Sequence, residues 1–341
     1  MTLKDVAKAA GVSPSTVSRV IHSAGKNFAS PQVRHRVWDA VRQLGYVPNQ
    51  QAQSLKKGKS APQAPSTIHI LFARSKSPHG DSYFDELATY VQEEILSRGY
   101  QVGSLLTRHE AEASPPGALS VGKRDGLVVL GRTRKSLDPF IAQFSRRAVY
   151  VTLNQMELEA DHIMCDGVQA TRTAMQYLYD NGHRHIAYVG EYPNDVRYQG
   201  FWNFVTENTL TYSRETILNT PMTAEGGFAA AQKLLDCKMR PTAVFCANDV
   251  TAIGLLKGLH QLGAVVPRDL SVISIDNIAE AGETIPGLTT VKIPLKDLGS
   301  FAVKTLVDRI EKGHSIYVHV FMPSELLIRD SVRPLKSSRW A

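Results

Sequence analysis

The feature that most constrains the fold of this chain is a regular alternation of short apolar runs with amphipathic helical patterns. An apolar run over 68–72 is followed by a helical pattern over 84–98, which ends at Gly99, and by a further run over 101–106. Such alternation is typical of parallel α/β sheets whose strands are joined by crossover helices. It extends over residues 68–291, roughly 225 residues, which is long for a single sheet.

The rest of the expected core follows the same rule. The expected strands lie at 126–130, 148–153, 185–189, 243–246, 271–275 and 318–321. The expected helices lie at 138–144, 168–181, 197–206, 226–238, 250–262 and 298–312. Residues 331–341 contain Pro334 and no periodic apolar pattern, so we expect them to form a frayed tail.

The first 45 residues have the pattern of three short helices. Thr2 is a good N-cap for a helix over 3–10, which Gly11 ends as a C-terminal glycine does. Ser13 caps a second helix with Pro14 at its first position, where proline is favoured. Ser30-Pro31 starts a third helical pattern, which ends at Gly45. Three short helices with a glycine turn between the first two form a helix-turn-helix, so an all-α N-terminal domain is predicted.

Positive charge is concentrated in the same part of the chain. Residues 1–60 contain ten lysines and arginines against two aspartates, a net charge of +8, whereas the whole chain carries +7. Everything after residue 60 therefore sums to −1. A compact basic segment beside a nearly neutral body is typical of a module that binds a polyanion. A solvated basic face is the alternative, and the charge alone does not decide between the two.

Residues 46–60 contain few apolar side chains. Asn49 can cap a short helix there, in which only Ala52 and Leu55 are apolar. Such a helix buries little surface and is marginal by itself. Residues 60–66 contain two prolines and are typical of a linker.

A series of short motifs runs along nearly the whole chain. In the N-terminal part they are Thr2-Leu3-Lys4-Asp5-Val6-Ala7, Ala10-Gly11-Val12-Ser13, Thr16-Val17-Ser18-Arg19-Val20 and Tyr46-x-Pro48-Asn49-x-x-Ala52-x-x-Leu55. In the core they are Asn181-Gly182-His183-Arg184-x-Ile186-Ala187, Arg197-x-x-Gly200-Phe201, Ala247-Asn248-Asp249-x-x-Ala252-x-Gly254 and Pro286-x-Leu288-Thr289-Thr290-Val291. In the same order, these motifs resemble those of the LacI/GalR family of bacterial repressors.

The resemblance implies an all-α helix-turn-helix headpiece and an α/β periplasmic-binding-protein-like core of two doubly wound subdomains, with a ligand between them. The implied parts are a DNA-binding domain at 1–48, a hinge helix and linker at 49–66, a ligand-sensing core at 67–330 and a tail at 331–341. The N-subdomain would span about 67–163 and 292–321, and the C-subdomain about 164–291 and 322–330.

Two segments depart from the family pattern. The loop at 22–29 is longer than is usual, and residues 106–125 are polar and contain prolines where relatives usually have a helix. Both features are similar to the branch of the family that contains the evolved β-galactosidase repressor.

The second helix of a helix-turn-helix presents its N-terminal residues to the major groove. The resemblance puts Pro14, Ser15 and Arg19 at these base-reading positions. Arg19 can hold guanine O6 and N7 with two hydrogen bonds, and contact with a phosphate alone is the alternative. Small polar residues near helix starts are candidates for phosphate contacts and, equally, for plain capping: Thr2, Ser13, Thr16, Ser18 and Asn27.

The hinge contacts that the resemblance implies are Asn49, Ala52, Gln53 and Leu55, and Gln53 stands where many relatives carry arginine. An exposed leucine on a marginal basic helix suits a wedge between base steps in the minor groove. The alternative is Leu55 packed against the core. Two hinge helices side by side in a dimer would bury Ala52, and such helices would fold only when docked.

Effector residues are expected where parallel strands end, because ligands bind outside the carboxyl ends of such strands. The family pattern makes Arg197, Asn248 and Asp276 the first candidates. Asp249 is equally a ligand contact or a cap of the following helix. Weaker candidates, for which ordinary loop or core packing is the alternative, are Ser75, Asp81, Thr152 and Met222.

Neither a catalytic nor a metal pattern is recognised. The sequence has no glycine-rich phosphate loop and no Gly-x-Ser-x-Gly motif. His183 and His185 are two residues apart at a strand start and would point to opposite faces. The three cysteines are scattered and fit a reducing cytoplasm. We expect no enzyme activity, no catalytic residue, no metal and no cofactor.

The expected function is that of a DNA-binding transcriptional repressor of carbohydrate-utilisation genes. Its partners would be double-stranded operator DNA and a small effector, a sugar or galactoside. No apolar run long enough for a membrane span and no leader pattern occurs, so we expect a cytoplasmic, nucleoid-associated protein. A transporter's solute-binding protein is the competing function, and the basic headpiece counts against it. Two-fold operators need a homodimer, and residues 331–341 lack the heptads of a tetramer helix.

Overall fold

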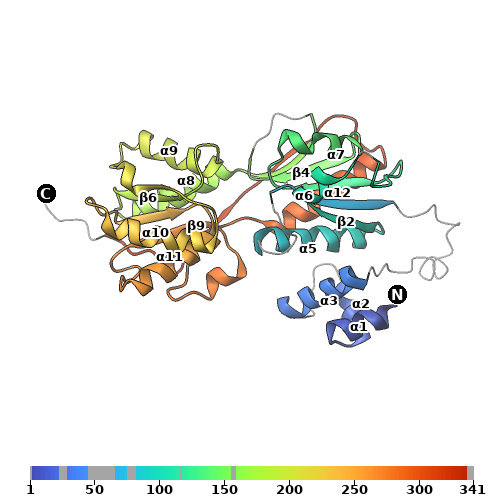
Figure 1. The fold of residues 1–341 in the computed structure, drawn as a ribbon, viewed down its shortest axis with the longest axis horizontal. Coiled ribbons are helices and arrows are strands. Elements are labelled where there is room, and N and C mark those ends of the chain that lie inside the picture. The colour runs from blue at the N-terminus through green and yellow to red at the C-terminus, as the bar shows by residue number, and fades with distance from the viewer. Residues whose placement is uncertain are drawn as a thin grey trace. The chain divides into compact units, whose positions relative to one another are not determined.

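The computed structural model describes residues 2–22, 29–44, 66–74, 82–115, 117–154 and 159–335, which form helices and two sheets (Figure 1). The chain divides into two units. The first comprises Met1–Thr152, Met156–Met164 and Leu295–Val320, and the second comprises Leu153–Gln155, Cys165–Pro294 and Phe321–Ala341. The main crossings between the two units come after residues 164, 294 and 320. Among the described helices, none is both long and apolar enough to cross a bilayer.

The N-terminal headpiece consists of the helices α1 (Leu3–Ala10), α2 (Pro14–His22) and α3 (Pro31–Leu44). Thr2 and Asp5 form a capping box at the start of α1, in which the Asp5 carboxylate accepts from the Thr2 backbone N–H at 2.7 Å. Gly11 ends α1 with φ of 64°, a conformation that glycine adopts at little cost. The helices enclose an apolar core of their own, made of Val6, Ala7, Ala10, Val17, Ile21, Val37, Trp38, Ala40 and Val41.

The first unit is built on a six-stranded sheet in the order β11-β5-β4-β3-β1-β2. Strands β1 to β5 pair in parallel, as the strand and helix alternation predicted. Its strands are β1 (Thr67–Phe72), β2 (Gln101–Thr107), β3 (Gly126–Leu130), β4 (Ala148–Thr152), β5 (Asp161–Cys165) and β11 (His319–Met322). Its helices are α5 (Ser82–Ser97), α6 (Arg108–Ala113), α7 (Asp138–Ala142) and α12 (Leu295–Ile310), with the 3-10 turn η1 (Lys135–Leu137).

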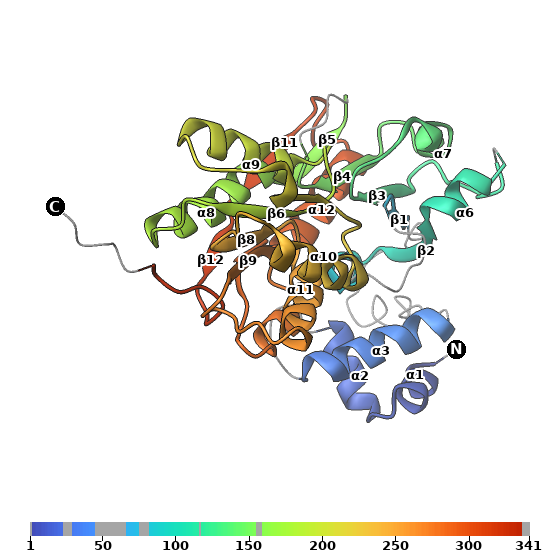
Figure 2. The same ribbon diagram turned by 60° about the vertical axis from the view of Figure 1, so that its left-hand side comes forward.

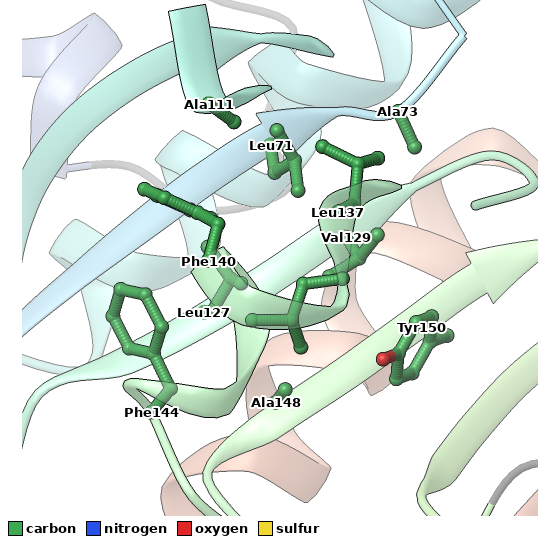
Figure 3. Packing of buried hydrophobic residues seen from close by; sticks show 11 residues of the cluster. Leu71, Ala73, Ala111, Leu127, Val129, Leu137, Phe140, Phe144, Ala148 and Tyr150 are labelled. Carbon is green, nitrogen blue, oxygen red and sulfur yellow. The ribbon is translucent and has the colours of Figure 1, made fainter. Parts of the chain in front are cut away.

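Both faces of this sheet are covered. Helices α6 and α7 supply Ala111 and Phe140 to a buried cluster on one face, where they meet alternate residues of β3 and β4 such as Val129 and Tyr150 (Figure 3). Helix α12 lies on the other face, because a Cβ at Gly126 would stand 3.0 Å from side chains of that helix. The alternation of strand residues between faces explains why these strands are apolar throughout.

A short helix interrupts the polar stretch at 106–125, where the sequence departs from the family pattern. Thr107 and Glu110 form a capping box, with 2.8 Å from the Thr107 N–H to the Glu110 carboxylate, and α6 follows directly. The helix ends at Ala113, before the proline-containing residues. The stretch is therefore partly helical, and the Thr-x-x-Glu spacing is the local signal for it.

The second unit has a six-stranded sheet in the order β12-β10-β9-β8-β6-β7. All neighbours pair in parallel except β12, which is antiparallel to β10. Its strands are β6 (Ile186–Gly190), β7 (Ile217–Asn219), β8 (Ala243–Cys246), β9 (Ser271–Asp276), β10 (Thr289–Lys292) and β12 (Glu325–Leu327). Its helices are α8 (Gly167–Asp180), α9 (Val196–Glu207), α10 (Ala224–Asp236) and α11 (Asp249–Gln261), with the 3-10 turns η2 (Arg214–Thr216) and η3 (Ala279–Gly282).

Helices α8 and α9 pack on one face of this sheet, and α10 and α11 pack on the other (Figure 2). Glycine permits the close approach of α10 and α11. A Cβ at Gly227 would lie 1.9 Å from the Thr251 carbonyl oxygen, and one at Gly254 would lie 2.0 Å from that of Ala224. This sheet thus has the doubly wound arrangement predicted from the alternation.

The prediction of a frayed tail from residue 331 is wrong for its first residues. Ser331 is fully buried, donates to the Val272 carbonyl at 2.6 Å and accepts from the Thr289 N–H at 2.8 Å. The Leu335 N–H donates to the Asn181 carbonyl at 2.8 Å. Residues 331–335 are held by hydrogen bonds to β9 and to the end of α8. The sequence of this segment has no periodic apolar pattern, so these contacts could not be predicted from it.

Candidate DNA-reading and effector sites

Helix α2 presents the predicted base-reading residues outward. Val17 and Ile21 face the headpiece core, whereas Pro14, Ser15 and Arg19 are exposed. Ser15 and Arg19 are four residues apart and therefore share a face of the helix. This is the geometry that a recognition helix requires.

Two of the small polar residues of the headpiece, Thr2 and Ser13, act as helix caps. The Ser13 hydroxyl accepts from the Thr16 N–H at 3.1 Å, and Thr2 closes the capping box of α1. Thr16 and Ser18 are half-buried on α2. Caps at helix N-termini leave a hydroxyl beside backbone N–H groups, which is also where phosphates bind. The predicted contacts Asn27, Asn49, Ala52, Gln53 and Leu55 lie outside the described residues, so the wedge role of Leu55 stays a prediction.

Arg197 is the best-defined polar group of the second unit. It lies in the first turn of α9, after β6, and its side chain is 8% exposed. Its guanidinium donates to Asp195 through Nε at 2.8 Å and Nη2 at 2.9 Å, and Nη2 also contacts the Met222 sulfur at 3.2 Å. Burial alone would lower the pKa of Arg197, but Asp195 and Asp276 together raise it above its usual value. The guanidinium is therefore permanently charged and held in one orientation.

Asp195 was missed by the sequence reasoning. It is the N-cap of α9, where its carboxylate also accepts from the Arg197 N–H at 2.9 Å. The Asp-x-Arg spacing at the start of a helical pattern was the available signal, because aspartate is favoured at N-caps.

Asn248 and Asp249 follow β8 but have different roles. Asn248 is the N-cap of α11 and accepts from the Thr251 N–H at 3.1 Å. The Asp249 carboxylate is fully buried. It accepts hydrogen bonds from the hydroxyls of Ser274 at 2.5 Å and Thr290 at 2.6 Å. It also accepts one from the backbone N–H of Ile278, the residue before η3. Burial raises the pKa of Asp249 to about 6, against the opposing effect of these hydroxyls. Asp249, which follows β8, is therefore hydrogen-bonded to residues of β9 and β10. Asn248, and not Asp249, caps α11.

Asp276 is the last residue of β9 and is buried. Its φ of 126° and the φ of 57° at Asn277 place two consecutive non-glycine residues in the left-handed region. Such conformations are costly and cluster at ligand sites. Because β9, β8, β6 and β7 are neighbours in the sheet, their carboxyl ends bring Asp276, Asn248 and Arg197 to one edge.

The weaker candidates fall in different places. Met222, half-buried, contacts Arg197 and belongs to the same edge. Thr152 is the buried last residue of β4 in the first unit. Ser75 and Asp81 lie outside the described residues.

His183 and His185 have structural partners. The His183 ring nitrogens contact the Thr242 hydroxyl at 2.9 Å and the Arg333 carbonyl at 3.1 Å, and His185 Nδ1 contacts the Arg240 carbonyl at 3.1 Å. Among the described residues, no group of three histidine, cysteine or acidic side chains is arranged to hold a metal ion.

Comparison with known proteins supplies the family. Residues 2–49 match the bacterial regulatory proteins of the lacI family, and residues 175–332 match the periplasmic binding protein-like domain. The HTH-type transcriptional repressor PurR of Erwinia tasmaniensis is 32% identical over 331 residues, which are 93% of this chain and 94% of the relative. This chain belongs to the lacI family.

Other lacI-family relatives extend over the same length. The ribose operon repressor of Haemophilus influenzae is 31% identical and covers 98% of this chain and 99% of its own. The solved structure described as a transcriptional regulator CelR-cellobiose complex is 27% identical, with a TM-score of 0.70, over 97% of this chain and 99% of that chain. The predicted helix-turn-helix headpiece with a periplasmic-binding-protein-like core is confirmed. The chain is a DNA-binding transcriptional repressor regulated by an effector, and not an enzyme.

Proposed function

We propose that the chain is a homodimeric repressor of carbohydrate-utilisation genes that binds a sugar-like effector through the carboxyl edge of its second sheet. The observation that carries this proposal is the set of Arg197, Asn248 and Asp276 at that edge. Asn248 and Asp276 lie at the ends of the neighbouring strands β8 and β9, and Arg197 lies in the first turn of α9. Saccharides and galactosides are the effector class. As a DNA-binding repressor, the chain would work on the nucleoid in the cytoplasm.

The chemistry of the three side chains supports a polyol. Each sugar hydroxyl both donates and accepts, so it is matched by a guanidinium that donates, a carboxylate that accepts and an amide that does both. Nη2 of Arg197 also contacts the sulfur of Met222, a flexible side chain that can pack against the apolar face of a sugar ring. The relative named ribose operon repressor and the neighbour solved with cellobiose agree with this class.

A thermal-shift panel tests the effector class. Monosaccharides, disaccharides, galactosides and nucleosides are each added to the full chain. A ligand at 100 times its Kd stabilises the folded state by about 2.7 kcal/mol, enough to raise Tm by several degrees. We expect the shift with saccharides, and a shift with nucleosides alone would contradict the proposal.

Replacing Arg19 by alanine should weaken binding to the operator by at least about 30-fold, because a dimer loses two bidentate base contacts of about 1–3 kcal/mol each. Binding to a scrambled duplex should change little. Fluorescence anisotropy on both duplexes at one salt concentration measures this. Arg36→Ala is the matched control, since Arg36 is an exposed arginine on α3. Equal losses on both duplexes for Arg19→Ala would reduce Arg19 to a phosphate contact.

The expected assembly is a dimer without DNA. Operators made of two half-sites match a two-fold protein. Light scattering at micromolar concentration should give the dimer mass, and a tetramer mass would be inconsistent with this assignment.

A further inference from the structure

The charge of Arg197 is already paired within the protein. Asp195 accepts two hydrogen bonds from it, of 2.8 and 2.9 Å, and both side chains are 8% exposed. The same carboxylate caps α9, which fixes its position independently of the guanidinium. The pair is therefore a preformed part of the fold.

This pairing uses the edge of the guanidinium that recognises anions. Nε and Nη2 form the fork with which arginine binds a phosphate or a carboxylate in bidentate fashion. In this chain an internal carboxylate occupies that fork, and the Met222 sulfur also lies 3.2 Å from Nη2. A phosphate brought to Arg197 would have to displace Asp195 or approach a guanidinium whose charge is neutralised.

A second carboxylate makes the same edge of the sheet negative. Asp276 is buried and close enough to Arg197 to raise the pKa of the guanidinium. Two aspartates beside one arginine favour hydroxyl donors and disfavour anions by several-fold or more, because charges act strongly where water is excluded.

We propose that Asp195 is a specificity-determining residue that restricts the effector to uncharged saccharides and excludes their phosphates. The proposal rests on the saccharide class proposed above. It assigns Asp195 a positioning role toward Arg197 and an electrostatic role toward the ligand.

The test compares neutral and phosphorylated forms of one sugar. Galactose is paired with galactose 6-phosphate, and ribose with ribose 5-phosphate, in calorimetry on the full chain. The unmodified chain should bind the neutral form at least tenfold more tightly. In Asp195→Asn, which keeps the cap but removes the charge, this ratio should fall by tenfold or more, or about 1.4 kcal/mol.

The matched control is Asp269→Asn. Asp269 makes the same fork contact with Arg268, through Nε and Nη2 at 3.0 Å each, but it is exposed and lies before the first residue of β9, at the opposite end of the strand from Asp276. Its replacement removes an equal charge from the same unit and should leave the ratio unchanged. Asp195→Ser, with a hydroxyl that also caps helices, serves if the asparagine variant does not fold.

The outcomes separate the two proposals. Tighter binding of the phosphate by the unmodified chain overturns the role of Asp195 and leaves a saccharide effector in place. An unchanged ratio in Asp195→Asn and Asp195→Ser reduces Asp195 to a cap. If no saccharide of either form binds, the proposed effector class fails, and the specificity proposal fails with it.

Discussion

Removal of residues 1–60 should abolish operator binding and leave a soluble core that still binds the effector. The deleted part carries a net charge of +8, and its helices close an apolar core of their own. The remaining chain has a net charge of −1 and retains both sheets. Since phosphate contacts supply most of the affinity for DNA, the loss should exceed about 10³-fold at physiological salt.

Fluorescence anisotropy with operator DNA measures the loss, and thermal unfolding with and without saccharide checks the core. The truncated chain should unfold cooperatively and keep its ligand-induced rise in Tm. Residual binding to the operator at physiological salt would place DNA contacts in the core. It would contradict the assignment of DNA binding to residues 1–60.

Replacing Arg197 by alanine should remove the response to effector while operator affinity stays within about twofold of the unmodified chain. The variant loses a charged hydrogen-bond donor to the ligand, worth about 1.5–3 kcal/mol, or roughly 10- to 100-fold in affinity. Calorimetry measures the effector, and anisotropy measures the operator. Arg172→Ala is the matched control, because Arg172 is an exposed arginine on α8 paired with Glu207 at 2.6 Å.

The Arg197→Ala variant is also expected to lower the free energy of unfolding. Arg197→Ala leaves the buried Asp195 carboxylate without its guanidinium, and breaking a buried pair costs about 3–5 kcal/mol. The double variant Asp195→Asn with Arg197→Leu removes both charges and should recover most of the unfolding free energy without recovering effector binding. Effector binding by this double variant would move the site away from Arg197.

The regular elements were predictable because their signals are local. Strands such as 126–130 and 243–246 are apolar throughout and lie in the sheets as expected. The short strands β7, β10 and β12 were not predicted, and neither was β5, which contains the polar residues Asp161 and His162. In the fold Asp161 is paired with Arg309 at 2.6 Å from the far end of α12. Because Asp161 has this partner 148 residues away, β5 can lie in the core despite its polar residues. Sequence periodicity does not indicate such a distant ion pair.

The candidate site was likewise predictable only in part. Arg197, Asn248 and Asp276 follow from strand ends and family motifs. The distinction between Asn248, which caps a helix, and Asp249, which binds three strands together, depends on which hydroxyls stand opposite. The pairing of Asp195 with Arg197 likewise required side-chain positions, although the cap at Asp195 could have been read from the sequence.

We propose a coupling, within one chain, between DNA reading by α2 and effector binding at the carboxyl edge of the second sheet. Its most direct test is a reciprocal titration of the full chain with the saccharide that gives the largest thermal shift. Operator affinity is measured by anisotropy with and without saccharide, and saccharide affinity by calorimetry with and without operator. Linkage requires the two ratios to be equal, and we expect a factor of about 5–150. Saccharide that binds with the same affinity whether or not operator is present would contradict the coupling.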